Sequence, residues 1–215
     1  MTQQTLPPIR SGGALPVHRG IVALDAEGPV RRSNGVRGGL RKEIHRLLED
    51  SLRAAGINDE HRDIFADRDD GVLALIRPVD ELPKTLLLDA VIPALARLAG
   101  AYNTELPPAE RPLRLRAVVH SGEVHLDGRN CFGEAVDVAF RLLRAPRTSA
   151  GPGDPVVLVI SEEIYYSIVR HGYVGIDRDA FTPFVRFQSG RVRRSWLNVG
   201  SSGDTLADSG AAPTR

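Results

Sequence analysis

The chain has 215 residues, of which 42% are apolar and 26% charged, and its 28 basic and 27 acidic side chains give a formal net charge of +1. This composition is ordinary for one globular domain. A charge so close to neutral provides no field that would attract nucleic acid or an anionic membrane, so we expect neither as a partner. The single cysteine, Cys131, cannot close an internal disulfide, which favours a reducing, cytoplasmic setting.

The two ends of the chain differ in composition from its middle. Residues 1–18 are rich in Pro and Gly without periodicity, and residues 201–215 are small and polar. Both patterns predict disordered tails around one domain, residues 19–200. The start has no apolar signal core, and the most apolar helix-length segment, 85–102, is interrupted by Asp89, Pro93 and Arg97. We therefore expect no membrane span.

Apolar periodicity predicts the first elements in chain order. Residues 20–25 form a short apolar strand, and residues 37–56 have helical spacing and end at Gly56. Residues 62–67 and 71–76 predict a hairpin whose second strand is buried on both faces. Residues 80–102 predict a second helix, kinked at Pro93.

The second half continues the alternation. We expect a strand over 114–124, a helix over 133–146, a strand that passes through a Ser161 N-cap into a short helix, and a terminal hairpin over 186–199. The order β-α-β-β-α-β-α-β-α-β-β predicts an α+β fold: helices packed on a mixed sheet, with a ferredoxin-like βαββαβ core and a C-terminal hairpin. No G-x-G-x-x-G motif follows the first strand, so a dinucleotide-binding fold has no support.

Two acids lie where strands of this core begin and end. Asp25 ends the first strand and Asp70 immediately precedes the third. In a βαββ arrangement those two strands are commonly neighbours, so the two carboxylates would converge at one edge of the sheet. Together with the backbone carbonyl of Ala26, such a pair suits one or two hard divalent cations that also hold phosphates. The alternative is that each Asp only caps a turn.

Four motifs carry a resemblance to a known family. They are LDAEG (24–28), DDGVLALI (69–76), RLRAVVHSGEV (114–124) and FGEAVDVAFRLL (132–143). In this order they resemble the motifs of class III nucleotidyl cyclase domains, over roughly residues 20–200, and more loosely those of the pyrimidine cyclases of Pycsar anti-phage systems. The resemblance implies conversion of a nucleoside triphosphate to a 3′,5′-cyclic nucleotide and pyrophosphate. It also implies two divalent cations (Mn²⁺ or Mg²⁺) and a homodimer with two composite sites.

The resemblance assigns roles residue by residue. Asp25 and Asp70 match the two metal-binding aspartates, and the carbonyl of Ala26 would assist them. Arg141 matches the arginine that steadies charge on the α-phosphate in the transition state. Asp137 stands where the family has an asparagine that positions the ribose. From the residues alone, Arg141 could instead lie along the helix surface with its guanidinium in solvent.

Further positions concern the base and the triphosphate. By the same resemblance, Asn130 falls where purine cyclases have a base-reading polar residue, and Ala66 stands where they have a base-reading lysine. Arg68 could reach a smaller base or could simply neutralise neighbouring acids. Arg193, in a basic hairpin, could grip the triphosphate or could be part of an ordinary charged sheet edge.

The departures from the family pattern leave two hypotheses open. Without a lysine at 66 a purine loses its usual contact, which favours a pyrimidine triphosphate, UTP before CTP, and a role in anti-phage signalling. Alternatively, the domain is catalytically degenerate and binds a nucleotide or a partner without turnover. Asp137 favours this second hypothesis, because a carboxylate accepts a hydrogen bond but cannot donate one, and it adds negative charge near a triphosphate.

Overall fold

The computed structural model describes residues 15–28, 34–63, 65–68, 71–128, 130–144, 154–188 and 191–198. In chain order the elements are β1 (Val17–Glu27), α1 (Asn34–Ala54), β2 (Ala66–Arg68), β3 (Gly71–Ile76), a π-helical turn (Leu87–Val91), α2 (Ile92–Glu105), β4 (Arg114–Asp127), β5 (Asn130–Phe132), α3 (Glu134–Leu143), β6 (Val156–Ser161), α4 (Glu162–Ser167), β7 (Phe181–Gln188) and β8 (Arg191–Asn198).

The strands form one mixed sheet in the order β2-β3-β1-β4-β6-β8-β7, with β5 paired to β4. The strands β2-β3-β1-β4 have the antiparallel order of a ferredoxin-like βαββαβ core. Strand β6 then pairs in parallel with β4, and the β7–β8 hairpin extends the sheet through β8. This arrangement confirms the predicted α+β fold with a mixed sheet and a C-terminal hairpin.

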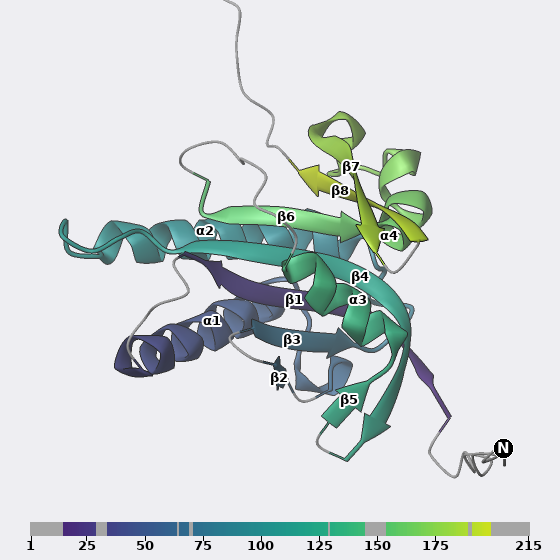
Figure 1. Ribbon diagram of the computed structural model, residues 1–215, viewed down its shortest axis with the longest axis horizontal. Helices are drawn as coiled ribbons and strands as arrows, with labels where there is room; N and C mark the ends of the chain where they lie inside the picture. Colours follow the sequence, from purple (N-terminus) through teal and green to yellow (C-terminus); the bar gives the residue numbers. More distant parts are fainter. Residues whose placement is uncertain are drawn as a thin grey trace, which may run out of the picture.

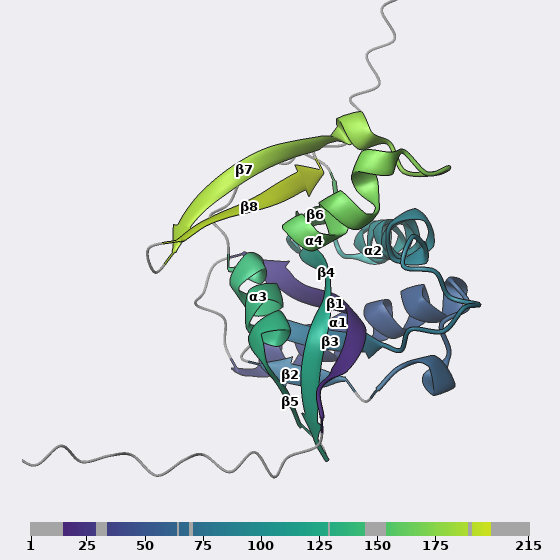
Figure 2. The same ribbon diagram turned by 90° about the vertical axis from the view of Figure 1, so that its right-hand side faces the viewer.

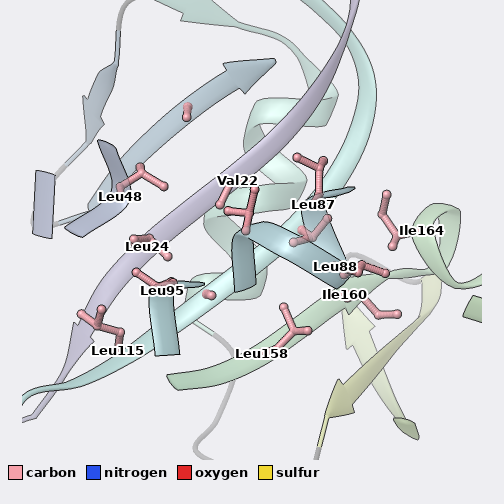
Figure 3. Close-up of a cluster of buried hydrophobic side chains, with 14 of the residues drawn as sticks. Val22, Leu24, Leu48, Leu87, Leu88, Leu95, Leu115, Leu158, Ile160 and Ile164 are labelled. Carbon is pink, nitrogen blue, oxygen red and sulfur yellow. The ribbon is translucent and has the colours of Figure 1, made fainter. Parts of the chain in front are cut away.

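Helices cover both faces of the sheet. Helices α1 and α2 lie on one face and α3 lies on the other (Figures 1 and 2). Side chains along a strand alternate between faces, so Val22 and Leu24 join the core under α1 and α2 (Figure 3), whereas Ile21 and Ala23 join the core under α3. Strand β3 is buried over its full length, as its unbroken apolar run predicted.

Two expected boundaries were wrong. Strand β1 begins at Val17, inside the segment expected to be a tail, because Val17 and His18 pair with Val124 and Glu123 of the long strand β4. The predicted helix over 80–102 begins only near Leu86 and opens with the π-helical turn.

Pro93 gives the physical reason for the π-helical turn. Its ring nitrogen cannot donate to the carbonyl of Asp89, four residues earlier, and the ring crowds that carbonyl. The π-helical turn at Leu87–Val91 runs directly into α2 and widens the helix where this hydrogen bond is missing.

Gly71 opens β3 at a point of close approach to β1. A Cβ added there would lie 3.2 Å from the Leu24 carbonyl oxygen and 3.4 Å from Leu143 Cδ1. We expect Gly71→Ala to lower the free energy of unfolding by about 1–3 kcal/mol, the usual cost of overpacking. Gly38→Ala, where the added Cβ meets nothing within 4 Å in α1, should raise it by about 0.5–1 kcal/mol. Urea denaturation measures both, and equal effects would contradict the close approach.

Candidate active site

Asp25 lies at the end of the β1–β3 pairing. The last registered pair is Leu24 with Val72, so Asp25 follows directly beside the start of β3 at Gly71. Alternation places Asp25 on the same face as Ile21 and Ala23, toward α3. Asp70 precedes Gly71 in the sequence but lies outside the described residues. The predicted adjacency of the two strands is therefore confirmed, whereas the convergence of the two carboxylates stays a prediction.

A buried ion pair lies beside Asp25. Arg116 of β4 stands opposite Asp25 in the register and is only 3% exposed. Its guanidinium donates to Glu27 Oε1 at 2.9 Å (from Nη2) and to the Leu143 carbonyl oxygen at 3.5 Å (from Nη1). This pair ties the end of β1 to the end of α3. No local sequence pattern encodes this pair, because Glu27 and Arg116 meet only through the pairing of β1 with β4.

Helix α3 carries the other candidate groups. Its apolar side, which includes Ala135, Ala139 and Phe140, is buried on the sheet. Asp137 lies in its first turn and Arg141 in its last, the positions that the helix dipole favours for an anion and a cation. The two residues are four apart, so they share one side of the helix.

A cavity of about 960 Å³ lies between α3, β5 and the edge strand β2, and we call it the α3–β2 cavity. It brings together four positions singled out in the sequence from three separate elements. Its described lining residues are Phe65, Ala66, Asp67, Asn130, Cys131, Phe132, Gly133, Glu134, Val136, Asp137, Phe140 and Arg141. Neither Asp25 nor Ala26 is among these described lining residues.

Two arginines proposed from the sequence are only partly described. Arg68 lies in β2 with its backbone paired to Gly71, and Arg193 lies in β8 paired to Arg186. Both side chains lie outside the described residues, so their roles stay predictions.

Asp67 has a structural role that the sequence did not show. Its carboxylate binds His45 Nε2 at 2.6 Å and the Arg41 guanidinium, both on α1. Burial raises the pKa of Asp67, but the hydrogen bonds from Arg41 and His45 outweigh burial and hold that pKa below its usual range. These contacts fasten the three-residue strand β2, and with it Ala66, to helix α1 along one wall of the cavity. Asp67 is far in sequence from Arg41 and His45, so no local sequence pattern predicts these contacts.

The donors at the end of β1 fit a hard cation. A carboxylate at Asp25 and a backbone carbonyl at Ala26 are the oxygen ligands that Mg²⁺ and Mn²⁺ prefer. Among the described residues no group of three or more His, Cys, Asp or Glu side chains could hold a metal ion.

Comparison with known proteins gives the fold a name. No family model and no curated protein matches the sequence. Among solved structures, an adenylate/guanylate cyclase/hydrolase from Silicibacter pomeroyi matches 86% of this chain and 98% of its own, with a TM-score of 0.61 and 21% identity. The chain has the fold of class III cyclase catalytic domains.

Two further cyclases have the same fold. The catalytic core of a rhodopsin-guanylyl cyclase with converted specificity, in complex with ATPαS, matches 86% of this chain and 96% of its own, with a TM-score of 0.56 and 11% identity. A bacterial light-regulated adenylyl cyclase matches 85% and 90%, with a TM-score of 0.55 and 13% identity. As for membranes, none of the described helices has the length and apolar character needed for a span.

Proposed function

We propose that the protein is a nucleotidyl cyclase that converts a nucleoside triphosphate to a 3′,5′-cyclic nucleotide and pyrophosphate. The observation that carries the proposal is the α3–β2 cavity, which gathers Asn130, Asp137 and Arg141 on a cyclase fold. A volume of about 960 Å³ is ample for a nucleotide. In the reaction the 3′-oxygen forms a bond to the α-phosphorus, the bond to the pyrophosphate oxygen breaks, and the hydroxyl proton leaves to solvent.

Asp25, Ala26 and Asp70 would hold two divalent cations, Mn²⁺ or Mg²⁺, at the mouth of the β1–β3 pair. Bound there, such cations lower the pKa of a hydroxyl and neutralise phosphate charge. The buried pair of Arg116 and Glu27 fixes the strand end that carries Asp25, so the carboxylate is held in place before substrate arrives.

Helix α3 would act on the ribose and the α-phosphate. Arg141 offers a planar set of donors for the oxygens on which charge develops. Asp137 accepts a hydrogen bond from a ribose hydroxyl. Arg193, on the β7–β8 hairpin that projects on the α3 side of the sheet (Figure 2), would contact the outer phosphates.

A pyrimidine base, UTP before CTP, fits the cavity wall best. Ala66 lines the cavity together with Asn130 and presents a methyl group, which makes no hydrogen bond with a purine edge. An unpaired buried acceptor costs about 1–3 kcal/mol. A smaller base leaves room for Asn130 or Arg68 to donate to the carbonyls of uracil.

The proposed active unit is a homodimer, and the proposed setting is cytoplasmic anti-phage signalling in which the cyclic nucleotide is a second messenger. Asp25 is not among the described residues that line the α3–β2 cavity, which supports a site that two chains share. C2 symmetry then gives two such sites.

One experiment tests the activity and the base together. Purified protein is incubated with Mn²⁺ and an equimolar mixture of the four NTPs, and the products are identified by mass spectrometry. We expect cUMP as the main product, roughly 10- to 100-fold over cAMP and cGMP. Predominant cAMP or cGMP would refute the base preference. No cyclic product would refute the cyclase and favour a degenerate nucleotide-binding domain, the second candidate suggested by the acid at position 137.

A further inference from the structure

A second cavity lies on the other side of α3. It has a volume of about 490 Å³ and is enclosed by α3, the start of α4 and the ends of β4, β6 and β8. We call it the α3–α4 cavity. Arg141 lines both cavities, so α3 is a shared wall between them.

The floor of this cavity is polar although it belongs to the sheet core. His120, Ser161 and Ser195 stand side by side on β4, β6 and β8, and they are 9%, 4% and 2% exposed. Buried polar side chains are uncommon in a sheet core and need partners. His120 Nδ1 and Ser161 Oγ bind each other at 2.8 Å, and Ser161 Oγ also accepts from the Ile164 N–H.

Ser195 is different from its two neighbours. Alternation along β8 places it on the same face as Leu197, which packs in the core under α3, and it lines the cavity. Its hydroxyl makes no side-chain hydrogen bond to the part of the chain that the structure describes. Ser195 is a nearly buried residue whose hydroxyl lines the cavity, so a ligand atom there would gain a hydrogen bond.

The rim of the cavity is acidic. Glu134 on α3, Glu162 and Glu163 on α4 and Glu123 on β4 line it, together with the guanidinium of Arg194 on β8. Arg141 also faces the α3–β2 cavity. Four carboxylates therefore stand against two guanidiniums. The Glu123 carboxylate binds His18 at 2.9 Å, whereas Glu162 and Glu163 form no ion pair with any described residue.

We propose that the α3–α4 cavity binds a small organic polycation of the polyamine class. Ammonium groups donate to carboxylates on two separate walls and to the Ser195 hydroxyl, and an extended chain of amines reaches both walls at once. An anion would meet the repulsion of the four carboxylates. Because Arg141 lines both cavities, occupancy would also change cyclase turnover; this consequence, unlike the binding itself, rests on the proposed function.

Calorimetric titration of the full chain with spermidine, without nucleotide or metal, tests the binding. We expect saturable binding that weakens at least tenfold in the double variant Glu162→Gln/Glu163→Gln and several-fold in Ser195→Ala. The matched control, Glu105→Gln/Glu110→Gln, removes two exposed charges beyond the cavity and should leave the affinity unchanged. Circular dichroism verifies that each variant is folded.

The other outcomes overturn the proposal. Equal weakening in both double variants would mean unspecific attraction to surface acids, and stronger binding of inorganic phosphate than of spermidine would mean an anion site. The titration contains no nucleotide, so it does not depend on cyclase activity. A chain that binds spermidine as described but makes no cyclic nucleotide would refute only the proposed cyclase activity. Cyclase activity without spermidine binding would refute only the proposed polyamine site.

Discussion

Asp25→Asn is expected to lower cyclase turnover by about 10²- to 10³-fold, because losing one anionic metal ligand removes several kcal/mol of transition-state stabilisation. The substitution keeps the size of the side chain at the end of β1, next to the buried pair of Arg116 and Glu27. The thermal midpoint should therefore change little. Product formation at saturating NTP and a range of Mn²⁺ concentrations measures the effect.

The dependence of the rate on Mn²⁺ concentration shows whether Asp25 is a metal ligand or has only a structural role. A lost ligand should raise the Mn²⁺ concentration required for half-maximal rate, and Asp70→Asn should do the same. Asp80→Asn, in the exposed loop after β3, is the matched control and should behave as the unaltered protein. If Asp25→Asn shifted neither the rate nor the Mn²⁺ requirement, Asp25 would be only a turn residue.

The order of elements could be predicted because each has a strong local pattern. The apolar run of β3, the Ser161 N-cap that accepts from the Ile164 N–H, and Gly56, with a φ of 79° after α1, all have the predicted roles. The short strand β5 and the first residues of β1 were missed, because only pairing with β4 makes them strands.

The site was predictable only in part, for a related reason. Asn130, Asp137 and Arg141 were identified from motifs, and the fold gathers them in one cavity. The contacts of Asp67 with α1 and of Arg116 with Glu27 join residues distant in sequence. Such contacts follow from sheet register and helix packing, which no local pattern encodes.

Mixing two inactive variants should restore activity if the site is shared between chains. The described residues that line the α3–β2 cavity of one subunit include Asn130, Asp137 and Arg141 but neither Asp25 nor Ala26. A partner related by C2 symmetry would bring its own Asp25 to this cavity. Arg141→Ala alone should lower turnover by about 10²- to 10³-fold, as removal of a transition-state donor does, whereas Arg97→Ala, an exposed arginine of α2, should not.

The expected recovery follows from counting sites. After random exchange of Asp25→Asn and Arg141→Ala subunits, about half of the dimers contain one of each. In such a dimer one site carries both substitutions and the other carries none, so the mixture should regain about a quarter of the unaltered activity. Exchange is verified with two affinity tags. Verified exchange without recovery would show that each chain builds a complete site, because only then does every dimer retain a substitution in both of its sites.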